Sequence, residues 1–157
     1  MNKSPRMIEW LPRLGEAQVL CVGDVMLDRF VYGEVERISP EAPIPVLRIT
    51  RQDVTVGGAG NVARNLSALG ASVRLFGVVG DDAEGAELRA VLADDAAITL
   101  ALFTGPSRPT TVKTRYIAGV QQLLRTDEED LDAMPQALLG QLSEELSKEI
   151  SSGAYGA

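Results

Sequence analysis

Two short apolar runs, each closed by a glycine, constrain the fold of this chain more than any other feature. The first is AQVLCVGD at residues 17–24, and the second is SVRLFGVVG at residues 72–80. Runs dominated by consecutive apolar residues are typical of strands that are buried on both faces of a parallel sheet. Parallel strands also need a long crossover between them, usually a helix. The two runs therefore predict an α/β fold.

Helical spacing of apolar residues predicts helices around these strands. One helix opens at Asp81, which precedes Glu84 by three residues as in a capping box. Another has Pro135 at its first helical position, and Ser4 is expected to cap a short helix near the start of the chain. Two further sets share one helix face each: Val62, Ala63, Leu66 and Leu69 in the middle of the chain, and Leu138, Leu142, Leu146 and Ile150 near its end.

Residues 31–56 follow a different pattern. Apolar and polar residues alternate there, and Pro40, Pro43 and Pro45 interrupt the alternation. This pattern predicts a half-exposed antiparallel element that projects from the main sheet. Two more strand-like runs, AITLALFT and TTVKTRYIAG, flank the turn-rich segment GPSRP, and Gly119 marks a turn before VQQLLRTDEED.

Length and charge limit the class of protein. The chain has 157 residues, which suits one domain, and a formal net charge of −7, which argues against general electrostatic binding of nucleic acid or anionic membrane. No apolar stretch reaches the length of a membrane helix, and the first residues lack a secretion signal. Cys21 is the one cysteine and is expected to be buried. These features predict a cytoplasmic protein.

The composition also limits the chemistry. The chain has no histidine, so histidine-based triads and the commonest metal ligand are excluded. The acidic run TDEED at residues 126–130 is expected to be a solvated turn rather than a metal site. No metal site is predicted.

The segment VGGAGNVARNL at residues 56–66 has three glycines in five positions before a predicted helix. A P-loop is excluded because no lysine and hydroxyl residue follow Gly60. Gly58, Gly60 and Ala63 satisfy the dinucleotide pattern G-x-G-x-x-G/A, but the preceding RQDVTV is polar and alternating, unlike the first strand of that motif. A tight turn that needs positive φ is the structural alternative.

A third interpretation is a site for a polyhydroxy compound. Gly57 and Gly58 would let a small molecule approach the main chain, and Asn61 offers both a donor and an acceptor. Asp28 lies beyond the end of the first strand and could accept hydrogen bonds from two neighbouring hydroxyls. Asp24 could contact the ligand or serve only as a turn or cap residue.

Three segments resemble the ribokinase-like (phosphofructokinase B) carbohydrate kinases: VLCVGDVMLDRFVYGEVERISPEAPIPVLRI, VGGAGNVARNLSALGASVRLFGVVGDDAEG and RPTTVKTRYIAGVQQLLRTDEE. Together they cover nearly the whole chain. Within the family, RISPEAPIPV and QQLLR are similar to the heptose 7-phosphate branch. The resemblance implies a Rossmann-like α/β domain with a small β-lid, formed by residues near 29–56 and 100–126. It also implies that residues 1–157 are the N-terminal part of one kinase domain whose C-terminal half is absent.

The same resemblance implies transfer of the γ-phosphate of ATP, with Mg²⁺, to the anomeric hydroxyl of a heptose 7-phosphate that belongs to ADP-heptose and lipopolysaccharide biosynthesis. Asp28, Gly57, Gly58 and Asn61 would hold the sugar hydroxyls. Lys113, Arg115 and Arg125 are candidates for the substrate's phosphate or for the lid lining, and solvated strand-edge charges are the alternative. A homodimer through the β-lid is a further expectation.

One departure from the family decides what the chain alone can do. Family members carry a second motif, Gly-Ala-Gly-Asp, whose aspartate is the base, whereas the segment GGAGN at residues 57–61 carries asparagine. No catalytic residue and no nucleotide site are therefore expected in this chain, and no turnover. The alternatives are a non-catalytic sugar-phosphate-binding or assembly module and, more distantly, a dinucleotide-binding oxidoreductase domain.

Overall fold

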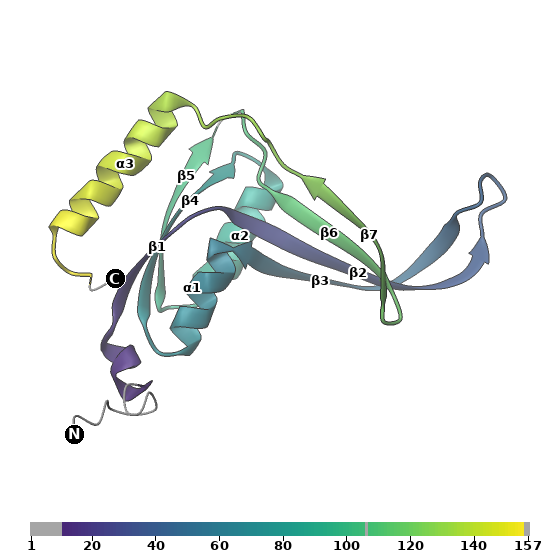
Figure 1. Cartoon of the computed structure of the whole chain (residues 1–157), viewed down its shortest axis with the longest axis horizontal. Helices are drawn as coiled ribbons and strands as arrows, with labels where there is room; N and C mark the ends of the chain where they lie inside the picture. Colours follow the sequence, from purple (N-terminus) through teal and green to yellow (C-terminus); the bar gives the residue numbers. More distant parts are fainter. Residues whose placement is uncertain (1–10, 106, 156–157) are drawn as a thin grey trace, which may run out of the picture.

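A computed structural model describes residues 11–105 and 107–155 and contains two sheets (Figure 1). The first sheet is parallel and has the order β1-β4-β5, formed by β1 (Gln18–Val22), β4 (Ser72–Gly80) and β5 (Ile98–Gly105). The second has the order β3-β2-β6-β7, formed by β2 (Val25–Ile38), β3 (Pro45–Gly58), β6 (Val112–Ala118) and β7 (Gln121–Glu128). The predicted α/β fold with a parallel sheet is confirmed.

Helices cover both faces of the parallel sheet (Figure 1). On one face, Val73 and Leu75 of β4 share a buried core with α1 (Ala59–Ala68) and α2 (Ala83–Ala93). On the other face, Arg74 of β4 forms an ion pair with Glu149 of α3 (Gln136–Ser151). Alternate residues of a strand point to opposite faces, so α1 and α2 contact one set of β4 side chains and α3 contacts the other set. We call these helices and the parallel sheet the α/β unit.

Two predicted helix starts differ from the structure by one residue. The N-cap of α2 is Asp82, not Asp81, because the side chain of Asp82 accepts the hydrogen bond from the amide of Gly85. Pro135 is the N-cap of α3 rather than its first helical residue. The expected apolar faces are buried only in part, since Leu138 is buried while Val62, Leu69 and Ile150 are exposed. A short 3-10 helix spans Leu11–Glu16, and the cap expected at Ser4 lies outside the described residues.

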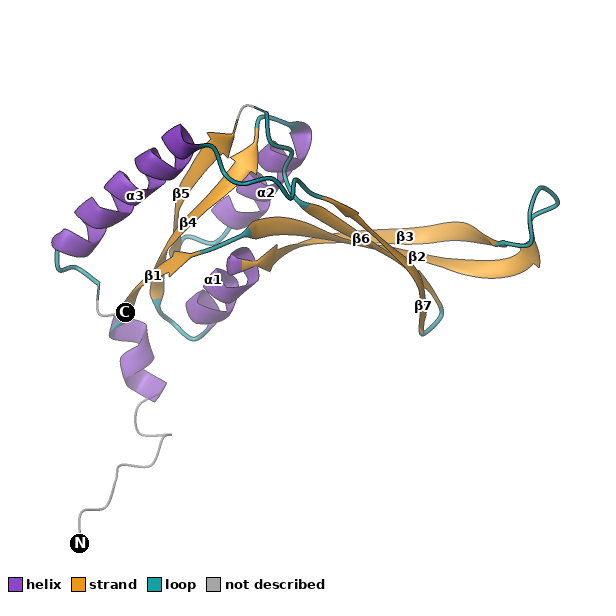
Figure 2. Ribbon diagram, turned by 45° about the horizontal axis from the view of Figure 1, so that its top comes forward, coloured by secondary structure: helices purple, strands orange, loops and turns teal. Residues whose placement is uncertain are grey.

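The second sheet projects from the α/β unit as a long, curved lid (Figure 2). β2 and β3 are antiparallel, as the alternation in residues 31–56 predicts, and Pro45 begins β3. β6 runs parallel to β2, and β7 returns antiparallel after Gly119, whose φ is +59°. Residues 100–105 belong to β5 of the parallel sheet, although the sequence grouped them with the lid. We use the term lid for β2, β3, β6 and β7.

The acidic run at residues 126–130 is not the solvated turn that the sequence predicts, because its first three residues belong to β7. Within residues 11–105 and 107–155, no group of three or more acidic or thiol side chains is arranged to hold a metal ion. None of the helices described here is long and apolar enough to cross a membrane. Cys21 is buried, as its apolar setting predicts, and burial raises the pKa of its thiol.

Candidate functional site

The glycine segment lies against the start of the lid. In the β2–β3 register, Met26 faces Gly57 and Val25 faces Gly58. A Cβ at Gly57 would lie 3.0 Å from Cγ of Asp28, and its carboxylate oxygen would be nearer still. The main chain of Gly57 and the carboxylate of Asp28 are therefore in direct contact, on the face of the sheet that also carries Met26. Residue 57 is a glycine because the carboxylate of Asp28 occupies the space that a Cβ would fill.

Gly58 is a glycine for a different reason. Its φ is +57°, a conformation that side-chain-bearing residues rarely adopt, and a Cβ there would also collide with the carbonyl oxygen of Asp24. That same carbonyl accepts a hydrogen bond of 2.8 Å from the amide of Ala59, which fixes the start of α1. The tight-turn interpretation is thus confirmed for Gly58. Asn61 follows in the first turn of α1 and is exposed.

The dinucleotide interpretation does not fit this geometry. Its glycines should follow a buried parallel strand. Here Gly57 and Gly58 are the last residues of β3, which is an edge strand of the lid and pairs antiparallel with β2.

Asp28 and Arg115 form an ion pair across the lid. Nη1 of Arg115 donates to Oδ1 of Asp28 over 2.5 Å, and both side chains are partly buried, 23% exposed for Arg115 and 18% for Asp28. The guanidinium also lies over the ring of Phe30, 5.2 Å from its centroid. The parallel pairing of β2 with β6 positions these groups, since Phe30 and Arg115 are register partners.

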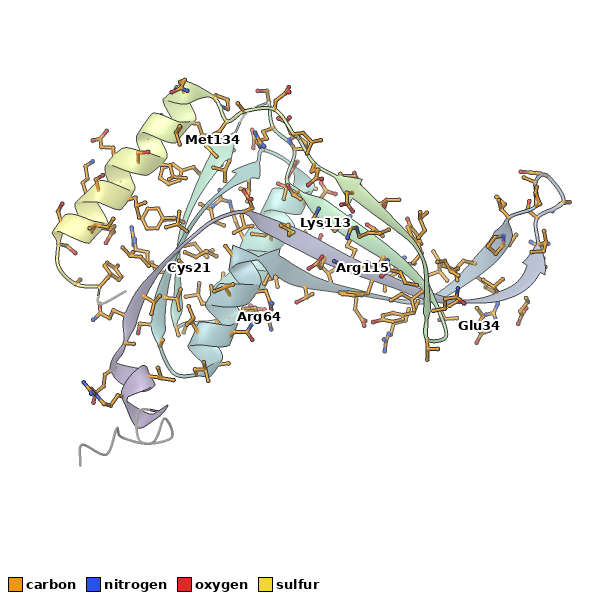
Figure 3. The ribbon with its side chains drawn as sticks, viewed as in Figure 1. Cys21, Glu34, Arg64, Lys113, Arg115 and Met134 are labelled. Atoms are coloured by element: carbon orange, nitrogen blue, oxygen red, sulfur yellow. The ribbon has the colours of Figure 1, made fainter. Side chains whose placement is uncertain are left out.

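Lys113 and Arg125 gather on the same face of the lid. Lys113 is the register partner of Asp28 on one side and of Asp127 on the other, and Arg115 is the partner of Arg125. Nζ of Lys113 donates to Asp127 over 2.9 Å and to Glu129 over 3.2 Å, and Nε of Arg125 donates to Asp127 over 2.8 Å. The hydrogen bond between Lys113 and Asp127 raises the pKa of the lysine and lowers that of the aspartate. Lys113 and Arg115 follow one another outward along the lid (Figure 3).

The family follows from comparison with known proteins. The model of the pfkB family of carbohydrate kinases matches residues 16–152 of the chain. The chain belongs to this family. The match includes the glycine segment, Asp28 and the three lid cations.

Relatives and solved structures agree with this assignment. The bifunctional protein HldE of Hyphomonas neptunium is 49% identical over 146 residues, which are 90% of this chain and 30% of that protein. A carbohydrate kinase from Agrobacterium tumefaciens has a TM-score of 0.59 and 28% identity, and covers 71% of this chain and 35% of its own. Phosphofructokinase-2 from Escherichia coli, solved with fructose-6-phosphate, has a TM-score of 0.62 and 24% identity over 84% of this chain and 41% of its own. The chain spans less than a third of the length of the HldE relative.

In this pfkB-family chain, the structure brings most of the sequence-predicted residues together but also adds two that the sequence missed. Asp28, Gly57, Arg115, Lys113 and Arg125 occupy neighbouring positions on one lid face. The missed residues are Asp127 and Glu129, which neutralise Lys113. The repeat of charged residues two apart, at 113 and 115 and again at 125 and 127, is the signal that two facing strands carry them.

Asp24 lies slightly apart from this lid face. It lines a cavity of about 220 Å³ between α3 and the carboxyl ends of β1 and β4, together with Val22, Val78, Arg108 and Met134. Ligands of open α/β sheets collect at the carboxyl ends of the strands. The lining is mainly apolar, and Asp24 and Arg108 are its charged residues.

Proposed function

We propose that this chain forms the acceptor-binding part of an ATP-dependent sugar kinase that phosphorylates the anomeric hydroxyl of a heptose 7-phosphate. The observation that carries the proposal is the contact between the Asp28 carboxylate and the bare main chain of Gly57, with three cations on the same lid face. An ionised carboxylate accepts hydrogen bonds only, and it has enough lone pairs for two neighbouring hydroxyls. Two neighbouring sugar hydroxyls can therefore donate to Asp28, whose carboxylate is held in place over the bare main chain of Gly57.

The three cations supply a site for the phosphate that the sugar already carries. Lys113 and Arg125 share Asp127 as their counter-ion, and that carboxylate is in an exposed position on β7. A phosphate brings more charge and more acceptor oxygens than one carboxylate, and arginine suits it through bidentate hydrogen bonds. Binding would thus exchange Asp127 for the substrate phosphate, while Arg115 stays with Asp28 and holds its orientation.

The heptose as substrate rests on RISPEAPIPV and QQLLR, which resemble the heptose branch of the family, and on the HldE relatives. We assign ATP binding and the catalytic base to a part of the enzyme outside residues 1–157, because the sequence has no Gly-Ala-Gly-Asp motif. ATP, when bound, supplies the transferred phosphoryl group with Mg²⁺. No residue described here is assigned to that ion, since no suitable cluster is present among them.

Calorimetry with heptose 7-phosphate and with the unphosphorylated heptose tests the proposal. The phosphorylated sugar should bind at least about tenfold more tightly, a difference of about 1.4 kcal/mol. The variant Lys113→Met should remove this preference, and Asp28→Asn should weaken binding of both sugars. Arg48→Gln is the matched control, because Arg48 is also an ion-paired lid cation but lies several rows further out, beside Glu34 and Glu36. Equal affinities for the two sugars in the parent chain would contradict the phosphate assignment.

The alternative function is a non-catalytic module that binds a sugar phosphate. This alternative predicts the same sugar binding by residues 1–157. It predicts a different activity for the protein that the whole gene encodes. A Gly-Ala-Gly-Asp motif in the reading frame after codon 157, together with ATP-dependent phosphorylation of the heptose, supports the kinase. A stop codon at that point, with binding but no phosphorylation, supports the module.

We further propose that the outer lid forms a homodimer. Six residues from three lid strands and the β2–β3 turn line an apolar cavity of about 400 Å³: Ile44, Pro45, Leu47, Tyr116, Leu123 and Leu124. Exposed apolar surface of this kind is typical of a protein interface. Sedimentation analysis should give a dimer that Leu124→Asp dissociates and that Leu131→Asp, at an exposed position outside the lid, leaves intact. A parent chain that stays monomeric at all concentrations would contradict this proposal.

A further inference from the structure

A partly buried hydrogen-bond network joins the lid to the α/β unit, and Asp82 is its centre. Oδ1 of Asp82 accepts from the amide of Gly85 over 2.7 Å and from the hydroxyl of Thr110 over 2.6 Å. Oδ2 accepts from the amide of Thr110 over 2.7 Å. The hydroxyl of Thr110 accepts in turn from the amide of Gly80 over 2.8 Å, and Thr110 is only 3% exposed. One carboxylate thus holds the end of β4, the start of α2 and the segment before β6.

The main chains around this network are in close contact. A Cβ at Gly80 would lie 2.7 Å from both the carbonyl oxygen of Arg108 and the amide nitrogen of Thr110. A Cβ at Gly85 would lie 2.6 Å from the carbonyl oxygen of Gly80. These distances are too short for any side chain, so both positions require glycine. The segment at 108–110 therefore has little freedom to move against β4 and α2.

This segment determines where β6 begins. β5 ends at Gly105 in the parallel sheet and β6 starts at Val112 in the lid, so the segment at 107–111 leads from one sheet into the other. The carbonyl of Thr111 accepts a hydrogen bond of 3.0 Å from Leu27, which marks the first contact of β6 with β2. Lys113 and Arg115 follow three and five residues after Thr110. Their register against Asp28 is set directly after the network.

We propose that Asp82 is a positioning residue that fixes the point at which β6 leaves the α/β unit, and thereby holds Lys113 and Arg115 beside Asp28. The part that concerns substrate binding rests on the proposed function, whereas the part that concerns the order of β6 does not. Asparagine cannot replace Asp82, because it has a single acceptor oxygen and its amide group would face an N–H or O–H donor of Thr110. Serine can replace Thr110, because it keeps both the amide and the hydroxyl.

Amide hydrogen exchange on the 157-residue chain, measured without ligand, tests the positioning role. Asp82→Asn and Thr110→Val should each raise exchange in residues 110–118 by about tenfold, the factor expected from the loss of one hydrogen bond to a charged group. Exchange in residues 72–79 of β4 should stay within about twofold, with Gly80 left out because its amide donates to the hydroxyl of Thr110, and Thr110→Ser should match the parent. The matched control is Asp95→Asn, because Asp95 also accepts a backbone hydrogen bond, from Ala97 over 3.0 Å, but in the turn before β5.

Two results would overturn the proposal. One is unchanged exchange in residues 110–118 of Asp82→Asn, and the other is an equal rise in residues 72–79, which would indicate general destabilisation. Calorimetry then separates this proposal from the proposed function. Asp82→Asn should lower the preference for heptose 7-phosphate over the unphosphorylated heptose, which a merely structural role would leave unchanged. If the parent chain shows no such preference, the proposed function fails, while the exchange results still decide whether Asp82 positions β6.

Discussion

The α/β unit and the lid are stabilised by different interactions. In the α/β unit, large apolar side chains such as Leu75, Leu88 and Leu92 are completely buried between the parallel sheet and α1 and α2. In the lid, ion pairs already occur beside Asp28, β2 has no buried residue after Gly33, and further out the side chains form ion pairs or include exposed apolar groups. The difference shows where each part can change. The α/β unit depends on buried apolar packing, whereas under the proposed function the lid would exchange an ion-pair partner for the substrate phosphate.

Truncation of the core should have the largest effect. Leu88→Ala removes a completely buried side chain of α2 and should lower the free energy of unfolding by about 2–5 kcal/mol. Leu124→Ala in the lid removes a side chain that is 55% exposed, so it should cost much less, below about 1 kcal/mol. Denaturant unfolding of both variants measures the difference. Equal losses would mean that the lid shares the core, contrary to the comparison above.

A backbone substitution where the two parts meet should have the next largest effect. Gly58→Ala places a Cβ at a φ of +57° and against the carbonyl of Asp24, so it should cost about 1–3 kcal/mol of unfolding free energy. Gly119→Ala is the matched control, since Gly119 has a φ of +59° but a Cβ added there would have no neighbouring atom within 4 Å. The difference between the two variants in chemical denaturation isolates the collision at residue 58. No difference would show that φ alone demands the glycine there.

The sequence predicts the α/β unit better than the lid, for a physical reason. The runs at 17–24 and 72–80 consist mostly of apolar residues, so their burial and their strand structure can be inferred from the local sequence alone. Strand membership in the lid depends on a distant partner. The runs at 98–105 and 112–118 both have strand-like patterns, yet the first pairs with β4 and the second with β2. A strand-like pattern does not identify the partner strand.

In the candidate site, too, some features could be predicted from the sequence and others could not. The proximity of Asp28 and Gly57 follows from the close approach that a bare main chain permits, and the two residues are in contact across β2 and β3. The N-cap of α2 could not be located in this way, because Asp81 and Asp82 are adjacent and both can cap. Thr110, 28 residues further along the chain, selects Asp82 through its hydroxyl and its amide. Residues 126–128 were missed as part of a strand because Lys113, the counter-charge of Asp127, lies on another strand.

Gly57→Ala tests the site with a smaller effect on folding. Gly57 does not have a positive φ, so the strain of this substitution comes from the contacts of the added Cβ. That Cβ would push the Asp28 carboxylate away from its place beside Arg115. Affinity for heptose 7-phosphate should fall by at least about tenfold, or about 1.4 kcal/mol, with a smaller loss of stability than Gly58→Ala. Calorimetry and denaturant unfolding of the two variants measure both quantities. Unchanged affinity would remove Asp28 and Gly57 from the sugar site.

The smallest predicted effect compares two carboxyl groups, one from each part. Burial alone would raise the pKa of Asp82, but hydrogen bonds from Thr110 and Gly85 outweigh it and lower the pKa. The pKa of Asp127 is lowered mainly by the hydrogen bond from Lys113, with further help from Arg125. Because both folded-state values lie below the ordinary value of about 3.9, each group favours folding above that pH and loses its contribution as the pH falls through the lowered pKa.

Salt should distinguish the two groups. Neutral donors hold Asp82, whereas cations hold the exposed Asp127, and ion pairs in solvent are screened at high ionic strength. In NMR titrations from low to about 1 M salt, the midpoint of Asp127 should move up toward the ordinary value while that of Asp82 stays constant. Lys113→Met should raise the midpoint of Asp127 in the same direction at low salt. A salt-independent midpoint for Asp127 would mean that its pairing with Lys113 is as tightly held as the partly buried network, and that a substrate phosphate could not readily displace it.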